Sequence, residues 1–120
     1  MPFMFENLKV YEKSVDLAEE IINPTDKFLK GYSFLIDQLN RASLSIATNI
    51  AEGNGRYTKK DRRNFFIIAR GSLQECIPLL EIAKRKQFIS DATMSKMFNQ
   101  FEVISRMLTG LINGIERRKI

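Results

Sequence analysis

The stretch MSKMFNQFEVISRMLTGLINGI, residues 94–115, decides the fold. Its apolar residues recur at alternating intervals of three and four, the spacing that places side chains on one face of an α-helix. The residues in this seam are Met94, Met97, Phe101, Ile104, Leu108, Leu111 and Ile115. Because the alternation is unbroken over three heptads, we predict a long amphipathic helix that starts after Ser90 as its N-cap.

Three earlier stretches show the same periodicity, over residues 8–22, 35–50 and 65–83. The seam predicted for the first comprises Leu8, Tyr11, Val15, Ala18 and Ile22. We expect Asn23-Pro24 to interrupt this helix, because a residue that precedes proline resists the α conformation. No stretch alternates with the period of a strand, so the sequence predicts helices alone.

The boundaries of the second and third helices follow from cap residues. We expect the second helix to stop at Gly53, since glycine suits a left-handed C-terminal cap. Thr58, with Asp61 three residues later, resembles a capping box and predicts the start of the third helix. Pro78 lies inside the third helix, where we expect a kink rather than a break.

Four amphipathic helices with short connectors satisfy one another most simply as an antiparallel up-down-up-down four-helix bundle. The sequence therefore predicts an all-α fold with a single domain over residues 1–120. The apolar stripes are wider than a bundle core needs, which indicates self-association. The additional apolar residues are Val10, Leu17 and Ile21 in the first helix and Phe98, Met107 and Ile112 in the last.

The composition excludes several classes of function. The chain has no histidine, so Ser-His and Cys-His nucleophilic sites and histidine-ligated zinc are excluded. Its single cysteine, Cys76, lies on an apolar seam and is expected in the core. No signal peptide or membrane-spanning stretch is evident, and we expect a cytoplasmic protein with no metal and no cofactor.

The net charge of +5 is unevenly distributed along the chain. Residues 1–55 contain 5 Lys and Arg against 8 Asp and Glu, whereas residues 56–120 contain 14 against 6. We therefore expect the second half to bind anions. Its candidate phosphate-binding residues are Arg56, Lys59, Lys60, Arg62, Arg63 and Arg70.

Most of these cations surround the predicted N-terminus of a helix, where the helix dipole favours anions. The alternative is a solvated basic surface that only keeps the protein soluble. Tyr57, beside them, is suited either to stacking on a base or to packing. The second candidates for phosphate binding are Lys84, Arg85 and Lys86, together with Arg117, Arg118 and Lys119.

A polar line follows one face of the second helix, at spacings of 3, 4, 4 and 3 residues. It consists of Gln38, Arg41, Ser45, Asn49 and Glu52. Our preferred interpretation is a hydrogen-bonded network, buried in the bundle or between subunits, in which Glu52 pairs with Arg41 or Arg56. The alternatives are a solvated face and, least favoured, a catalytic site, for which nothing here supplies a general base near neutral pH.

The pattern Gln38-x-x-Arg41-Ala42-Ser43-x-Ser45-Ile46-x-x-Asn49-Ile50-Ala51-Glu52-Gly53-x-Gly55-Arg56, followed by Ile68-Ala69-x-Gly71-Ser72-Leu73-x-Glu75, carries a family resemblance. It resembles the signature of the bacterial four helix bundle proteins known from intervening sequences of 23S ribosomal RNA genes, often labelled a ribosomal protein. The resemblance implies a homopentamer and no established enzymatic activity. It also implies kinship with the accessory proteins of diversity-generating retroelements, which bind nucleic acid and partner a reverse transcriptase.

The sequence thus leads to one preferred function and two rivals. We expect a non-enzymatic, oligomeric protein that binds RNA or DNA through its phosphates with little sequence specificity. The first rival is a homo-oligomeric scaffold for a protein partner such as a reverse transcriptase. An RNA-processing enzyme ranks third, because metal-assisted cleavage needs clustered carboxylates and the acids here are scattered.

Overall fold

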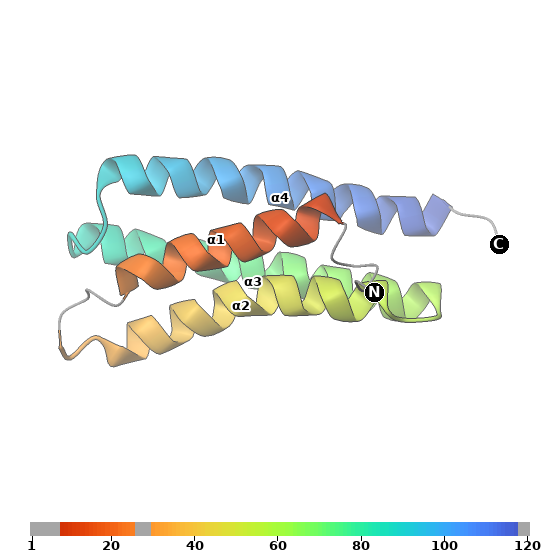
Figure 1. Cartoon of the computed structure of the whole chain (residues 1–120), viewed down its shortest axis with the longest axis horizontal. Coiled ribbons are helices and arrows are strands. Elements are labelled where there is room, and N and C mark those ends of the chain that lie inside the picture. The colour runs from red at the N-terminus through yellow and green to blue at the C-terminus, as the bar shows by residue number, and fades with distance from the viewer. Residues whose placement is uncertain (1–7, 26–29, 118–120) are drawn as a thin grey trace.

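The computed structural model describes residues 8–25 and 30–117, which form four helices. They are α1 (Lys9–Thr25), α2 (Ser33–Asn54), α3 (Lys59–Arg85) and α4 (Asp91–Arg117). These helices account for 88% of the described residues, which contain no strand. The chain reverses direction at each connector, and α4 returns to lie beside α1 (Figure 1). The predicted all-α, up-down-up-down four-helix bundle is confirmed, and it measures 51 × 25 × 23 Å.

Each helix buries one apolar stripe in a common core. The seams predicted for α2 and α4 are buried or half-buried, and in α3 the core side consists of Phe66, Ala69, Leu73, Cys76, Leu80 and Ala83. Phe66 is the largest of the fully buried side chains. Burial of this apolar surface is the main stabilising contribution to the fold.

The seam predicted for α1 is only partly right, because Ala18 is buried and Leu8, Tyr11 and Ile22 are half-buried, but the centre of the core side lies on the neighbouring stripe. Val15 is 42% exposed, whereas Val10, Leu17 and Ile21 are buried. The core side includes Ser14, whose hydroxyl donates a 2.7 Å hydrogen bond to the Val10 carbonyl. Because this bond satisfies the hydroxyl locally, a serine can occupy a core position. A pattern of apolar residues does not count serine and therefore misses this position. The residues counted as additional in α1 are therefore its own core.

The predicted N-caps of α3 and α4 are confirmed. The Thr58 hydroxyl accepts a 3.1 Å hydrogen bond from the Asp61 amide, and the Ser90 hydroxyl accepts one of 3.1 Å from the Thr93 amide. The predicted continuity of α3 through Pro78 is also confirmed.

The interruption expected at Asn23-Pro24 is not observed, because α1 continues through Pro24 to Thr25. Thr25 is buried, and its hydroxyl lies 2.7 Å from the Ile22 carbonyl and 3.2 Å from Oδ1 of Asn40 on α2. The contact with α2 holds the last turn of α1 in helical geometry, which outweighs the local effect of the proline.

Gly53 does not cap α2 in the left-handed conformation that the sequence predicts. The helix continues to Asn54, and Gly55, with φ −88°, follows as the C-cap. Gly53 is helical and buried, and a Cβ atom there would lie 2.9 Å from Cε1 of Phe66 and 3.0 Å from Cβ of Phe65. This glycine therefore serves the close approach of α3 to α2. Among the described residues, positive φ occurs at Gly31 (94°) and Gln87 (63°).

The substitution Gly53→Ala should destabilise the fold, although alanine favours helix by about 1 kcal/mol. The added methyl group overlaps a fully buried ring, and overpacking of this kind costs roughly 1–3 kcal/mol. Gly55→Ala is the matched control, because its Cβ would meet nothing nearer than 3.7 Å. Urea unfolding should therefore show a loss for the first variant and a change within about 0.5 kcal/mol for the second. A Gly53→Ala protein as stable as the wild type would contradict the packing role.

Candidate nucleic-acid interface

The predicted phosphate-binding residues begin in the turn that joins α2 to α3. In Figure 1 this turn lies at the same end of the bundle as the C-terminal end of α4, and at the opposite end from the α3–α4 connector. From Glu52 to Arg63 the chain carries five Lys or Arg and two acids, Glu52 and Asp61. This end of the bundle is therefore locally basic.

Backbone hydrogen bonds hold the turn at both of its ends. The Gly55 amide donates to the carbonyls of Ala51 and Glu52 at 3.3 and 3.2 Å, and the Arg56 amide donates to Gly53 at 3.3 Å. On the other side the Thr58 carbonyl accepts from the Arg62 amide at 3.0 Å, in addition to the side-chain cap. The turn is thus fixed relative to α2 and α3.

Arg56 is engaged within the protein. Its guanidinium lies 4.6 Å from the ring centroid of Phe65, and its Nη2 atom lies 2.9 Å from Oε2 of Glu52. Of the two partners predicted for Glu52, the structure selects Arg56. About half of each side chain in the pair remains exposed, so the contact offsets the positive charge only in part.

Lys59 and Lys60 lie in the first helical turn of α3, directly after the α2–α3 connection. Lys60 is exposed and Lys59 is half-buried. Within residues 8–25 and 30–117, neither ammonium group forms an ion pair with a carboxylate. The charges of these two lysines are therefore not offset by an ion pair within the described part of the chain.

The other three cations predicted for the site follow these lysines along α3. Arg62 is half-buried and, with Lys9, lines a cavity of about 370 Å³ whose walls include Phe66 and Met107. Arg63 is also half-buried, and Arg70 donates a 3.3 Å hydrogen bond to Oγ1 of Thr109 on α4. The structure therefore gives the predicted cations different surroundings, since Arg62 lines a cavity and Arg70 is bonded to α4.

The polar line of α2 is only partly a network. Asn49 donates hydrogen bonds of 2.8 and 2.9 Å to the carbonyl and hydroxyl oxygens of Ser45, and the Ser45 hydroxyl lies 2.8 Å from that of Ser72 on α3. Ser45 and Asn49 are half-buried, so this part links α2 to α3. Gln38, Arg41 and Glu52 are exposed in the single chain, and burial of those three between subunits stays a prediction.

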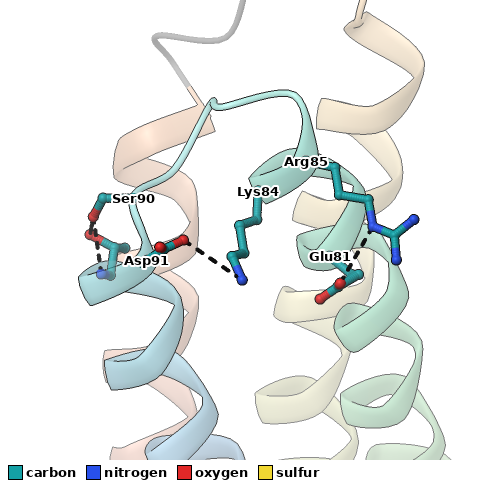
Figure 2. Close-up of polar contacts among 6 residues, drawn as sticks. Glu81, Lys84, Arg85, Ser90 and Asp91 are labelled. Carbon is teal, nitrogen blue, oxygen red and sulfur yellow. Dashed lines mark hydrogen bonds and ion pairs between the residues drawn. The ribbon is translucent and has the colours of Figure 1, made fainter.

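The second candidate cluster carries its own counter-charges. Nζ of Lys84 lies 3.7 Å from Oδ1 of Asp91, and Nε of Arg85 lies 3.5 Å from Oε1 of Glu81 (Figure 2). Lys86 is exposed. Arg118 and Lys119 lie outside the described residues. Arg117 ends α4 at the end of the bundle opposite Lys84, the end where the α2–α3 turn lies.

Cys76 is buried in the core, as expected. Burial raises the pKa of its thiol to about 12, with a smaller contribution from the negative charge of Glu75. The described part of the chain contains no group of three or more Cys, Asp and Glu side chains placed to hold a metal ion. Within those same residues, no helix is long and apolar enough to cross a membrane.

These features define a class of protein, an all-α four-helix bundle with a basic turn at one end. A family model described as 23S rRNA-intervening sequence protein matches residues 6–110. The chain belongs to this family.

A solved structure supports the same assignment. The crystal structure of a protein of unknown function from the S23 ribosomal protein family of Bacteroides thetaiotaomicron is 25% identical in sequence, with a TM-score of 0.78. The alignment covers 86% of this chain and 97% of that one. A search of curated proteins gave no match.

The raised pKa of Cys76 predicts a specific loss of stability in alkali. Above about pH 8.5 the thiol ionises in the unfolded chain but stays protonated in the folded one, so stability falls by up to about 1.4 kcal/mol per pH unit. Lysine and tyrosine titrations also contribute there, so Cys76→Ala is the reference. Between pH 9 and 10 the unfolding free energy of the wild type should fall more steeply than that of the variant. Parallel pH profiles would contradict burial of the protonated thiol.

Proposed function

We propose that this protein is a non-enzymatic, oligomeric nucleic-acid-binding protein whose α2–α3 turn holds phosphates with little sequence specificity. Lys59 and Lys60 are the primary phosphate ligands, and the nearby cations Arg56, Arg62, Arg63 and Arg70 add a favourable field. Lysine suits this role because its ammonium group contacts phosphate oxygens as a point charge without reading base edges.

The observation that carries the proposal is the contrast between the two ends of α3. At the C-terminal end, Lys84 and Arg85 each lie beside a carboxylate (Figure 2). At the N-terminal end, Lys59 and Lys60 have no carboxylate partner among the described residues, and the chain as a whole carries a net charge of +5. Cations gathered without counter-charges repel one another, and a polyanion relieves this repulsion.

Exposed apolar side chains on α2 and α3 support the oligomeric part of the proposal. Phe34 is 65% exposed and Leu44 48% on α2, and Ile68 is 49% exposed and Ile82 46% on α3. Leu44 and Ile68 flank the half-buried Ser45–Ser72 contact, where the small side chains permit close approach of another helix. A second copy of the chain would remove this surface from water. The number of five subunits rests on the family resemblance alone.

Reversal of the charge at Lys60 tests the binding site. Lys60→Glu should weaken binding to RNA and DNA by at least about tenfold, and the slope of log affinity against log salt should fall by about 0.7–0.9 for each phosphate that is no longer neutralised. Fluorescence anisotropy over a salt series measures both quantities. Because Lys60 is exposed, the substitution should leave folding unchanged.

Lys86→Glu is the matched control, since it reverses an exposed lysine at the opposite end of α3 and should leave affinity within about twofold of the wild-type value. Equal decreases in affinity for both variants would indicate a diffuse field without a site. A wild-type protein that binds no nucleic acid at low salt would contradict the function and favour the scaffold for a protein partner.

The oligomer is tested by placing a charge on the α2–α3 face. Light scattering of the wild type at micromolar concentration should give the mass of several subunits. The double variant Leu44→Asp and Ile68→Asp should be monomeric but folded, because both side chains are exposed in the single chain. Val15→Asp, at an exposed apolar position of α1, is the control and should still assemble. A monomeric wild type would contradict self-association.

A further inference from the structure

Tyr57 occupies the tip of the α2–α3 turn with its whole side chain in water. Its relative exposure is 103%, the highest among the exposed apolar and aromatic side chains of the described residues. It forms no hydrogen bond or ring contact with those residues, so the packing role considered from the sequence is not filled within one chain. The other tyrosines, Tyr11 and Tyr32, are half-buried, and Tyr32 packs edge-on against Phe88 at 4.8 Å.

The turn presents this ring on a fixed support. Gly55 and Arg56 are bonded to the last turn of α2, and Thr58 caps α3, so both neighbours of Tyr57 are anchored. The adjacent guanidinium of Arg56 lies over Phe65 instead of over the tyrosine ring. Both faces of the ring are therefore open, and little backbone order remains to be lost when a ligand stacks on it.

The two lysines that follow Tyr57 supply positive charge beside the ring. Lys59 and Lys60 follow Tyr57 by two and three residues, and neither is paired with a carboxylate among the described residues. An aromatic ring beside uncompensated cations is the arrangement that binds a nucleotide unit, with the base on the ring and the phosphates on the cations. A solvated basic surface accounts for the lysines but not for a fully exposed ring.

We propose that the α2–α3 turn is selective for single-stranded nucleic acid, with Tyr57 stacking on an unpaired base while Lys59 and Lys60 hold the adjacent phosphates. The inference rests on the proposed function and specifies its ligand class. Inside a duplex each base is covered on both faces by its neighbours, so only unpaired bases offer a face to the ring. The lysines bind the phosphates of single strands and of duplexes alike, and the ring adds affinity for single strands.

The test measures affinity at low salt for two probes of equal length. One is single-stranded oligothymidylate, and the other is the duplex that it forms with oligoadenylate. Tyr57→Ser should weaken single-strand binding by roughly 5- to 150-fold, the range measured for loss of base stacking, and leave duplex binding within about twofold. Tyr57→Phe, which keeps the ring, should retain the affinity. Val15→Ser removes an exposed apolar side chain on α1, outside the α2–α3 face, and should change neither affinity.

Tyrosine fluorescence supplies a second measurement, because the chain contains no tryptophan. Binding of oligothymidylate should quench the emission of the wild type, and Tyr57→Phe should bind equally well with the quenching abolished. Unchanged single-strand affinity in Tyr57→Ser, or an equal decrease for single strand and duplex, would overturn the inference. If Lys60→Glu still weakens binding in that case, the proposed function stands without the selectivity for single strands. A wild type that binds neither probe overturns both.

Discussion

The close contact between Gly53 and the ring of Phe66 determines how the rest of the molecule is arranged. Phe66 fills the core beside the end of α2, and any side chain at position 53 would overlap it. Because α2 and α3 approach this closely, the chain crosses between them in a short turn, and backbone bonds from Gly55 and Arg56 hold that turn to α2. The positions of Tyr57, Lys59 and Lys60 at the end of the bundle depend on this packing.

The structure distinguishes two kinds of cation that the sequence does not, namely arginines that form polar or cation–π contacts with other side chains and lysines that form none with the described residues. Arg56 stabilises the junction through Phe65 and Glu52, and Arg70 bridges to α4 through Thr109. Lys59 and Lys60 form no such contact with the residues that the structure describes. This difference between the arginines and the lysines supports the proposal that the lysines serve binding rather than folding.

Much of the fold could be predicted because the heptad pattern and the N-caps act locally. Ser90 and Thr58 cap helices through neighbouring amides, and the α4 seam follows directly from its spacing. The errors arose where tertiary contacts outweigh local preference. Thr25 extends α1 past Pro24 by contacting Asn40, and the reason for a glycine at position 53 is a ring thirteen residues away.

The sequence predicts where the candidate site lies, but not which of its cations contact other side chains and which do not. Charge density identified residues 56–63, whereas the engagement of Arg56 with Phe65 depends on a contact across the turn that spacing does not reveal. The polar line on α2 was identified by its period, yet its link to α3 depends on Ser72 opposite Ser45. The role of Tyr57 is ambiguous in the sequence, and its full exposure shows that the ring packs against no other described residue of the same chain.

Hydrogen–deuterium exchange of the wild-type protein with and without bound single-stranded oligonucleotide tests the central claim most directly, because it locates the ligand without altering any residue. The account predicts slower exchange in peptides that cover residues 55–63 and no change in those that cover residues 84–91. Protection confined to residues 84–91, or none at either end despite saturation with ligand, would contradict it.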